Sequence, residues 1–364
     1  MSATTDIASR PTHAAGHADD RDRGGPGQPL IIASDLTRHF PVRKGIFGRK
    51  TNAVRAVDGV SFTVKKGETL GIVGESGCGK STTARLLVGL TGIDSGELIF
   101  DGDRLGSDLS LQELWAGVQM VFQDSYASLN PRLTIEETIG FGPKMRGASA
   151  RDARTLAHDL LARVGLAPAR FAGRYPHELS GGQRQRVNIA RSVAMRPRLV
   201  ILDEAVSALD KSVEAQVLNL LRELKDEFGL TYVFISHDLN VVRYISDRIM
   251  VMYLGEVVEL GPVDAVWKRR AHPYTAALFA AMPSMDPDNR TEIPPLAGDP
   301  PNPIDPPTGC RFHTRCAFAE AVCADSAPCL SKVDEDVDHV AACHMLDPAS
   351  DHSMATGRVP EETE

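Results

Sequence analysis

The sequence predicts an α/β fold in which a parallel β-sheet is covered by helices on both faces. Apolar runs at 69–74 (TLGIVG), 199–203 (LVILD) and 231–236 (TYVFIS) have the length and composition of buried strands. Helical patterns follow the first two runs, at 80–90 and 212–229. Strands that alternate with helices in this way form parallel sheets, because each helix carries the chain back to the start of the next strand.

Composition and charge narrow the class of protein. The 364-residue chain is 42% apolar, which is enough for a large core, and its formal net charge is −8. A negative charge argues against a nucleic-acid partner, because phosphate backbones attract basic surfaces. No apolar run has the length of a membrane span, and the N-terminus lacks the apolar segment of a secretory signal. We therefore expect an intracellular protein that is soluble or bound to a membrane surface.

Changes in composition along the chain predict its organisation. The polar, Gly- and Asp-rich start predicts a disordered tail at 1–29, and we expect a second disordered tail at 346–364. The main domain is predicted at 30–270, with a helical subdomain at about 124–190. A Pro-rich run then opens a smaller extension at 271–345, which holds five of the six cysteines.

The stretch GESGCGKS at 74–81 matches G-x-x-x-x-G-K-[ST] and lies between a predicted strand and a predicted helix. Its glycines let backbone N–H groups curl around phosphates at the positive end of the following helix. Lys80 is expected to reach the β- and γ-phosphates, and Ser81 to bind Mg²⁺. The motif therefore predicts a P-loop NTPase that binds ATP. The residues predicted to contact ATP in this loop are Gly74, Ser76, Gly77, Cys78, Gly79, Lys80, Ser81 and Thr82.

Cys78 occupies one of the variable positions of this phosphate loop. We interpret it as a small side chain that fills space rather than as a nucleophile. Because it lies beside Lys80 at a helix N-terminus, the pKa of its thiol can be lowered, and alkylation of a reactive thiol at this position would block ATP.

The apolar strand at 199–203 ends in two consecutive carboxylates, Asp203 and Glu204. In α/β proteins, ligands bind at the carboxyl ends of parallel strands. We expect Asp203 to hold Mg²⁺ and Glu204 to act as the general base that activates the attacking water. A strand that merely ends at the protein surface is the alternative, and the phosphate loop upstream disfavours it.

A second glycine-rich helix start lies at 179–186, LSGGQRQR. Ser180, Gly181 and Gly182 precede a long helical pattern, so they too present backbone donors at a positive helix end. One bound nucleotide does not need two such helix ends in one chain. Two chains that face each other head to tail would use both, each covering the other's ATP.

LSGGQ followed by LVILDE resembles the signature of ATP-binding cassette (ABC) ATPases, which have a RecA-like P-loop domain with a helical subdomain. The resemblance implies that Phe40 stacks on adenine and that His237, in ISHD, contacts the γ-phosphate. It implies that Gln123, in VQMVFQD, contacts Mg²⁺ and water and senses the transmembrane partner. Any of these residues alone would have a structural interpretation. The residues that the resemblance assigns to the dimer are Ser180, Gly181, Gly182 and Gln183 at the partner's ATP, and Ser207 and Asp210 at the interface.

Further stretches resemble the oligopeptide/dipeptide importer subfamily, and in particular the F-type member of its paired ATPases. They are QMVFQDSYASLNPR (119–132), HPYTAAL (272–278) and the Pro-rich run that leads to GCRFHTRC (309–316). The resemblance implies a sister ATPase in a heterodimer, two permease subunits and a substrate-binding protein. It places the chain on the cytoplasmic face of the cell membrane, as the ATPase that powers uptake of di- and oligopeptides.

The transported substrate is less defined than the class of protein. ATPases of this subfamily also power uptake of nickel, glutathione and other small solutes, because specificity resides in the receptor and permease. A soluble ABC ATPase is a further alternative, but such proteins usually carry two cassettes or a long insertion before the signature. Ser125, Ala205 and Thr314 stand where the subfamily usually has proline. None of the three is a catalytic position, although Ser125 lies near the groove expected to receive the permease.

The cysteines of the extension predict a metal site. Disulfides are rare in a reducing cytosol, and a small domain with little core gains stability from ligation. Four thiolates suit an iron–sulfur cluster, whereas two or three cysteines with His313 or His344 suit zinc, and the spacing alone does not decide. The importer resemblance implies a 4Fe–4S cluster with a structural or redox-sensing role. The ligands that it implies are Cys310, Cys316, Cys323 and Cys343, without Cys329.

Overall fold

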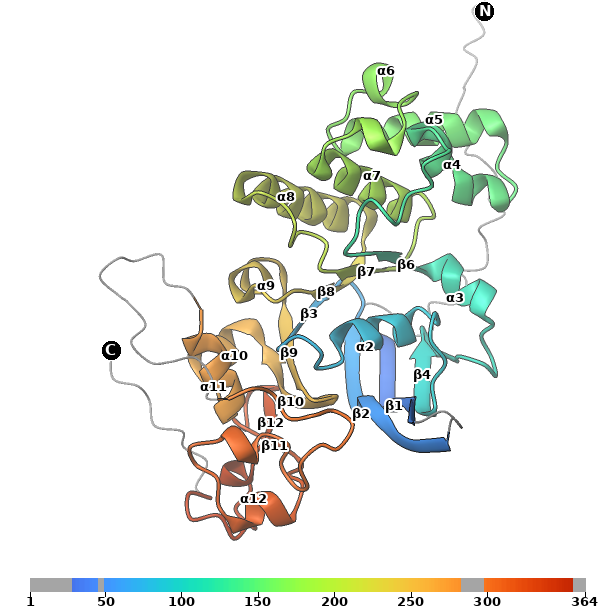
Figure 1. The fold of residues 1–364 in the computed structure, drawn as a ribbon. Coiled ribbons are helices and arrows are strands. Elements are labelled where there is room, and N and C mark those ends of the chain that lie inside the picture. Colours follow the sequence, from blue (N-terminus) through green and yellow to red (C-terminus); the bar gives the residue numbers. More distant parts are fainter. Residues whose placement is uncertain (1–27, 45–48, 283–297, 356–364) are drawn as a thin grey trace, which may run out of the picture.

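The computed structural model describes residues 28–44, 49–282 and 298–355. It confirms the α/β class, with a large sheet through the centre, a smaller sheet beside it, and helices packed around the large one (Figure 1). Helices between strands of the main domain include α2 (Lys80–Leu87), α3 (Leu111–Gly117), α8 (Lys211–Phe228) and α9 (Leu239–Ile245), and α10 (Val263–Lys268) follows β10. The extension begins with α11 (Pro273–Ala280).

Five parallel strands form the centre of the large sheet, in the order β9-β3-β8-β7-β6. They are β3 (Thr69–Val73), β6 (Val118–Val121), β7 (Leu199–Asp203), β8 (Thr231–Ile235) and β9 (Arg248–Tyr253). Every residue of β3, β7, β8 and β9 is buried. Strands that are buried on both faces have continuous apolar sequences, which explains the runs that predicted them.

The large sheet also has an antiparallel part that the sequence did not predict. It consists of β10 (Glu256–Pro262), β12 (Val340–Ala342) and β11 (Leu330–Lys332), which continue the sheet beyond β9. The predicted parallel sheet is therefore confirmed at the centre, and three antiparallel strands extend it. A tight turn at Leu254 and Gly255, with φ of 44° and 86°, joins β9 to β10, and two positive φ values are typical of hairpin turns.

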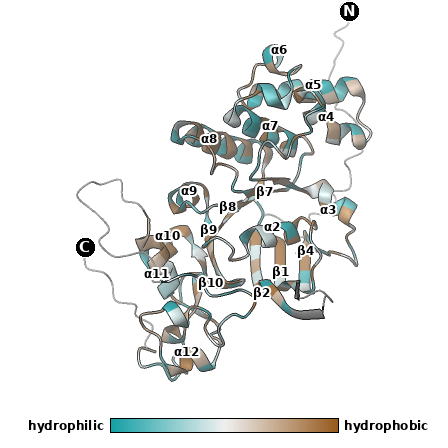
Figure 2. Ribbon diagram, viewed as in Figure 1, coloured by the Kyte–Doolittle hydropathy of each residue, from teal (hydrophilic) through white to brown (hydrophobic). Residues whose placement is uncertain are grey.

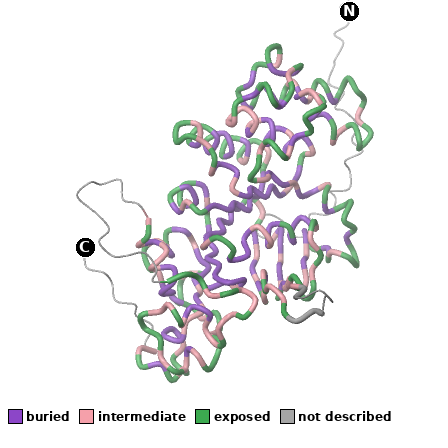
Figure 3. Tube along the Cα trace, viewed as in Figure 1, coloured by how far each residue is buried: buried purple, intermediate pink, exposed green. Residues whose placement is uncertain are grey.

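The sheet separates two hydrophobic cores. Along β8, Tyr232 and Phe234 belong to the core on one face, and Val233 and Ile235 belong to the core on the other. This alternation follows from the two-residue period of a strand. Figure 3 shows the buried residues concentrated along these strands, and Figure 2 shows apolar residues in the same places.

A smaller antiparallel sheet packs beside the phosphate loop (Figure 1). Its strands, in the order β2-β1-β4-β5, are β1 (Pro29–Lys44), β2 (Arg49–Lys65), β4 (Ser95–Phe100) and β5 (Asp103–Arg104). β1 and β2 pair along nearly their whole length. This sheet brings Phe40 and the start of the main domain close to the nucleotide-binding part of the chain.

The helical subdomain lies at the top of the molecule in Figure 1. It contains α4 (Ile135–Met145), α5 (Ala150–Arg163), α6 (Pro168–Phe171), the short η1 (Pro176–Glu178) and α7 (Gly181–Val193). Ser and Thr residues cap α4, α5 and α7 by accepting hydrogen bonds from the first turn. Among the described residues, no helix combines the length and apolarity needed to cross a membrane.

The C-terminal extension lies at the opposite end of the molecule from α6, with η2 (His313–Arg315), α12 (Ala321–Asp325) and η3 (His344–Leu346) (Figure 1). We expected no large core there and a disordered tail from 346. The buried cluster of the extension itself is small, as expected, although Phe312 packs into the larger core. The expectation of disorder was wrong at 346–355, which the structure describes. His352 is buried, and its ring donates to the carbonyl of Phe318 at 2.9 Å. The tails at 1–27 and 356–364 lie outside the described residues.

Candidate functional site

A cavity of about 520 Å³ opens at the carboxyl ends of the parallel strands. Such a volume lies in the range of ligand sites, and this edge of an α/β sheet is where ligands bind. The loops after β3, β6, β7 and β8 form most of its wall. The residues that line it are Ala56, Ser76, Gly77, Gly79, Lys80, Ser81, Thr82, Gln123, Glu204 and His237.

The phosphate loop connects β3 to α2 in a conformation that requires glycine. Gly74 and Gly79 have φ of 147° and 109°. A Cβ at Gly74 would lie 2.2 Å from the carbonyl oxygen of Met252, and one at Gly79 would lie 2.2 Å from that of Ala56. No side chain fits at such distances, so these positions let the backbone curl tightly and turn its N–H groups toward a bound phosphate.

Lys80 and Ser81 start α2 at the base of this loop. The buried Lys80 donates from Nζ to the carbonyl oxygens of Gly74 at 2.7 Å and Glu75 at 2.9 Å. Ser81 Oγ donates to Asp203 Oδ1 at 3.0 Å. Burial raises the pKa of Asp203, and the bond from Ser81 opposes that rise. A hydroxyl and a carboxylate side by side are oxygen ligands of the kind that Mg²⁺ prefers.

Glu204 follows β7 directly and has a left-handed backbone with φ of 47°. For a residue other than glycine this conformation costs on the order of 1–3 kcal/mol, and it persists only where the surroundings hold it. The Glu204 N–H donates to the carbonyl of Ile235 at 3.0 Å, which ties the residue to the end of β8. The turn directs the Glu204 side chain into the cavity lining.

Gln123 and His237 approach the same oxygen of Glu204. The Gln123 Nε2 donates to Glu204 Oε2 at 2.8 Å, and His237 Nδ1 lies 3.6 Å from that oxygen. The three residues follow β6, β7 and β8, which are neighbours in the sheet. The structure therefore brings together a carboxylate, an amide and an imidazole that are distant in sequence. Such a group can orient a water and accept its proton.

Phe40 does not line this cavity. It lies on β1 opposite Val54, with 38% of its surface exposed. The Arg38 guanidinium lies 4.9 Å from the centre of its ring. The ring is accessible to a ligand, and its contact with adenine stays a prediction.

The signature residues form the N-terminus of α7, away from the cavity lining. The Ser180 N–H donates to Gln183 Oε1 at 3.0 Å, and Ser180 Oγ accepts from the Gln183 N–H at 3.3 Å. Ser207 Oγ donates to the carbonyl of Glu204 at 3.0 Å, and Asp210 occupies the N-cap position of α8 without a capping bond from its side chain. Gly181 and Gly182 open the helix itself. Their role toward a second chain's ATP stays a prediction.

The interpretation of Cys78 as a small space-filling side chain fits its burial, and only the lowered thiol pKa weighed beside it was wrong in direction. Cys78 is 3% exposed and lies beneath the phosphate loop, with Sγ 3.7 Å from Lys80 Nζ. Burial raises the pKa of this thiol and outweighs the attraction of the Lys80 charge. A buried thiol with a raised pKa is a poor nucleophile, so Cys78 is not a reactive site.

Four cysteines of the extension surround one small, largely apolar space, which we call the cysteine cavity. Cys329 is exposed and does not line it. Burial raises the pKa of Cys310 to about 11 and that of Cys343 to about 12. The residues that line the cysteine cavity are His272, Pro273, Cys310, Phe312, His313, Cys316, Phe318, Cys323, Cys343, His344, Met345 and His352.

The cysteine cavity is not arranged around a single ion. Within the described part of the chain, no group of three or more His, Cys, Asp or Glu side chains is placed to hold one metal ion. The two histidines weighed as zinc ligands have other partners. His313 Nδ1 donates to the carbonyl of Cys310 at 2.8 Å, and His344 Nε2 donates to that of Ser326 at 2.9 Å. A zinc site requires its ligands within about 2.0–2.3 Å of one point, whereas a cluster binds each thiolate through a different iron.

Comparison with known proteins places this geometry in a family. Residues 57–207 match the family model "ABC transporter", and residues 258–323 match "Oligopeptide/dipeptide transporter, C-terminal region". The oligopeptide transport ATP-binding protein AppF of Bacillus subtilis is 49% identical over 87% of this chain and 98% of its own length. The chain belongs to the ATP-binding proteins of the oligopeptide/dipeptide ABC transporter family.

Other relatives agree with this assignment. OppF of Salmonella typhimurium is 46% identical over 88% of this ABC protein and 97% of its own length. DppF of Escherichia coli is 48% identical over 83% of this protein and 90% of its own length. A dimeric, post-hydrolysis structure of the cassette MJ0796 bound to ADP and Pi is 32% identical, covers 64% of this chain and 99% of that one, and has a TM-score of 0.57. The ABC cassette is an ATPase of the kind that is coupled to transport, as the sequence predicted.

Several residues next to the nucleotide cavity were missed by the sequence analysis. They are Asp58, Glu75, Tyr274, Arg311 and Arg315, which join the extension to the ABC cassette. Each pair joins segments that are far apart in the chain, so no local spacing reveals it. The available signal was the pair of arginines between two cysteines in GCRFHTRC, an unusual composition for a segment that packs against a core.

Proposed function

We propose that this ABC protein hydrolyses ATP to power the uptake of di- and oligopeptides through a pair of membrane permeases. The observation that carries the proposal is the C-terminal region. Residues 258–323 match the model of oligopeptide/dipeptide transporters, beyond the cassette that ABC proteins share. Relatives with 43% to 49% identity over most of the chain are named as peptide transport ATP-binding proteins.

Glu204 is the proposed general base. It would accept a proton from a water that attacks the γ-phosphate, while Gln123, at 2.8 Å from Glu204 Oε2, orients that water. His237, on the other side of the same oxygen, would contact the γ-phosphate. The geometry supports these roles because all three side chains converge on one point of the cavity.

Lys80 and the phosphate loop would hold the β- and γ-phosphates. Lys80 Nζ bonds to two carbonyl oxygens of the loop, so binding of ATP requires it to exchange at least one of them for phosphate oxygens. Bound Mg²⁺ would neutralise charge on the phosphates, and Ser81, Asp203 and Gln123 would hold it. The 3.0 Å pair of Ser81 and Asp203 supports this assignment.

We propose a dimer in which each chain completes the other's ATP site. The signature residues at the N-terminus of α7 lie outside the cavity formed by their own chain. Ser207 and Asp210 would lie at the interface between the chains. The related cassette MJ0796, described as dimeric, supports a two-chain arrangement. A sister ATPase is the proposed partner, which makes the dimer a heterodimer.

The assembly that we propose contains two permease subunits and a substrate-binding protein on the far side of the membrane. The ATPases would lie on the cytoplasmic face, bound peripherally. Nucleic acid is not among the proposed partners, in keeping with the net charge of −8. Names of the relatives, which refer to peptide transport, support this assembly.

We propose that the cysteine cavity holds a 4Fe–4S cluster ligated by Cys310, Cys316, Cys323 and Cys343. All four thiols line one apolar space, and the fifth cysteine does not. Bound there, a cluster would stabilise a domain with few apolar residues and could respond to redox conditions. Zinc, the alternative, would have to draw its ligands around one point.

Metal analysis tests this cluster. The protein is purified without oxygen, and iron, acid-labile sulfide and zinc are measured for the wild type, Cys316→Ser and Cys329→Ser. About four irons with equal sulfide, retained in Cys329→Ser and lost in Cys316→Ser, is the expected result. One zinc without sulfide would refute the cluster and leave the ATPase assignment untouched.

Uptake by cells tests the transport function. A strain of the source organism that lacks this chain should lose uptake of a labelled tripeptide and regain it with the wild-type chain but not with Lys80→Ala. Uptake of labelled nickel and glutathione is measured in the same cells. Loss of either in place of tripeptide uptake would show that the importer carries that solute.

A further inference from the structure

The extension reaches the phosphate loop through Arg315. This side chain is 5% exposed and forms a two-pronged ion pair with Glu75. Nη1 donates to Glu75 Oε2 at 2.8 Å, and Nη2 donates to Oε1 at 3.1 Å. Glu75 is the second residue of the phosphate loop, 240 residues before Arg315. Paired bonds between a guanidinium and a carboxylate are directional, so they fix orientation as well as distance.

Glu75 is also held through its backbone. Its N–H donates to Tyr274 Oη at 2.8 Å, and its carbonyl accepts from Lys80 Nζ at 2.9 Å. Tyr274 is completely buried and belongs to α11, the first helix of the extension. Of the contacts described for Glu75, those from Arg315 and Tyr274 come from the extension, and the one from Lys80 comes from the lysine proposed to bind the phosphates.

Aromatic packing keeps the Arg315 segment in place. Phe312 is 3% exposed and belongs to the larger core. Its ring centre lies 5.4 Å from the rings of Tyr253 and of Tyr274, both in edge-on or T-shaped contact. The hydroxyl of Tyr253 accepts a further bond from Arg315 at 3.3 Å. Arg315 therefore extends from a segment that is packed into the core by the Phe312 ring.

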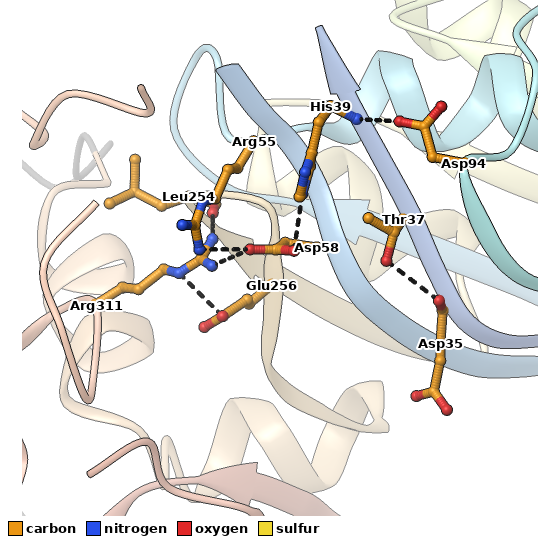
Figure 4. Close-up of polar contacts among 9 residues, drawn as sticks. All are labelled: Asp35, Thr37, His39, Arg55, Asp58, Asp94, Leu254, Glu256 and Arg311. Carbon is orange, nitrogen blue, oxygen red and sulfur yellow. Dashed lines mark hydrogen bonds and ion pairs between the residues drawn. The ribbon is translucent and has the colours of Figure 1, made fainter. Parts of the chain in front are cut away.

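A second arginine of the same segment contacts the small sheet (Figure 4). The Arg311 guanidinium pairs with Asp58 of β2, donates to the carbonyl of Leu254, and lies 2.9 Å from Glu256 Oε1. Asp58 also accepts from His39 Nε2 at 2.9 Å, and His39 precedes Phe40 on β1. The segment 309–316 therefore contacts both the sheet that carries Phe40 and the phosphate loop.

These contacts have a simple explanation as anchors that attach the extension to the cassette. The position of Glu75 in the phosphate loop indicates that these contacts also affect the ATP site. Its carbonyl is one of two that hold Lys80, so a shift of Glu75 also shifts the lysine. An unpaired carboxylate in this loop would repel a triphosphate, and Arg315 removes that repulsion by neutralising it.

We propose that Arg315 is a positioning residue for the phosphate loop: through Glu75 it holds the loop and Lys80 in the arrangement that receives the phosphates of ATP. The extension then sets the affinity of the cassette for ATP. Arg315 itself contacts no nucleotide in this account. The inference rests on the ATP site alone, and it is independent of the transported solute and of the metal in the cysteine cavity.

Equilibrium binding of MgATP tests this role. Full-length protein carrying Glu204→Gln, which prevents turnover, is titrated with MgATP in a calorimeter. Arg315→Gln is expected to raise Kd by about tenfold, because it frees the loop and leaves the Glu75 carboxylate unpaired. Glu75→Gln is expected to raise Kd by a smaller factor, about threefold, because it frees the loop without leaving a carboxylate to repel the phosphates. The double variant should be no weaker than the weaker single variant, since both changes break the same pair. Arg315→Lys keeps the charge without the paired geometry, so its Kd for MgATP should lie between those of the parent and of Arg315→Gln.

Lys332→Gln is the matched control. It removes one positive charge from the same extension, where Lys332 forms only an exposed pair with Glu335 at 3.7 Å. Its Kd for MgATP should stay within about twofold of the parent, because exposed pairs contribute little. In the assembled transporter, Arg315→Gln should raise KM for ATP and change kcat by less than about twofold.

An unchanged Kd in Arg315→Gln, with a lowered melting temperature, would overturn the proposal and make the pair an anchor only. A fall in kcat at unchanged KM would also overturn it. If Arg315→Gln does not fold, Glu75→Gln decides, because it leaves every residue of the extension in place. A raised Kd in that variant supports the role, and an unchanged Kd refutes it.

Discussion

Replacing Glu204 with glutamine removes one negative charge from the nucleotide cavity and preserves the size of the side chain. The oxygen of the new amide can still accept from Gln123, whose Nε2 lies 2.8 Å from Glu204 Oε2. The bond between the Glu204 N–H and Ile235 is a backbone contact and is unaffected. The variant therefore keeps the geometry of the site and removes the proposed base.

The size of the effect follows from the role. A positioned general base contributes about 10²–10⁴-fold to a rate. At about 1.36 kcal/mol for each factor of ten, the lost transition-state stabilisation is about 3–5 kcal/mol. The Kd for MgATP should change by less than about threefold, because the proposed role of Glu204 is at the attacking water, whereas the phosphate loop would supply most contacts to the nucleotide.

Single-turnover release of phosphate at saturating MgATP measures this rate in the assembled transporter. Glu223→Gln is the control, since it makes the same chemical change at an exposed position of α8. The control should match the wild type. A Glu204→Gln rate above one tenth of the wild-type rate would refute the assignment of Glu204 as the base.

Three further predictions concern the extension. Phe312→Ala should lower the free energy of unfolding by about 3–5 kcal/mol in urea titrations, because it empties a buried aromatic site, and a loss below about 1 kcal/mol would contradict the packing. Burial alone would raise the pKa of Asp58, but hydrogen bonds from Arg311 and His39 outweigh that effect, so the pKa is lowered overall. The stability that this pair contributes is complete above the unfolded pKa of about 3.9 and is lost as the pH falls from there through the lowered folded pKa. The difference in unfolding free energy between wild type and Arg311→Gln should therefore be constant at pH 5 and above and shrink below about pH 4, and a difference that stays constant below pH 4 would argue against the ion pair. Removal of the proposed cluster from the cysteine cavity should leave the Kd for MgATP within about twofold of the untreated protein, because Arg315 holds Glu75 through protein atoms alone, and a tenfold rise would show that the phosphate loop depends on the cluster.

The nucleotide site could be predicted from sequence because its chemistry is encoded locally. The spacing of the phosphate loop gives Lys80 and Ser81 their roles, and an apolar strand followed by two carboxylates gives Asp203 and Glu204 theirs. The convergence of Gln123 and His237 on Glu204 depends on the order of the strands in the sheet. A family resemblance, and no local pattern, assigned these last two residues.

The contacts between extension and cassette could not be predicted in this way. Arg315 and Glu75 are 240 residues apart, and the sequence around each of them does not indicate that they pair. The short strands β11 and β12 gain their place by pairing with β10, which is a tertiary effect and not a local propensity. His352 lies in a polar stretch whose composition indicated disorder, and its buried bond to Phe318 orders that stretch.

The Cys78 thiol shows why a neighbouring charge is a poor guide to pKa. Sequence places Cys78 two residues from Lys80, and that proximity favours the thiolate. The structure adds burial beneath the loop, which disfavours the charged form and prevails. Cys78 is buried in a hydrophobic cluster with Met252 of β9, and the sequence around Cys78 does not reveal this tertiary packing.

Transport by purified components tests the central claim most directly. Vesicles that contain this chain, its sister ATPase and the two permeases are supplied with a substrate-binding protein, a labelled tripeptide and MgATP, with each component on its own side of the membrane. The account predicts that tripeptide accumulates only with MgATP and that Glu204→Gln abolishes accumulation. Accumulation that survives Glu204→Gln, or uptake of glutathione or nickel without tripeptide, would contradict it.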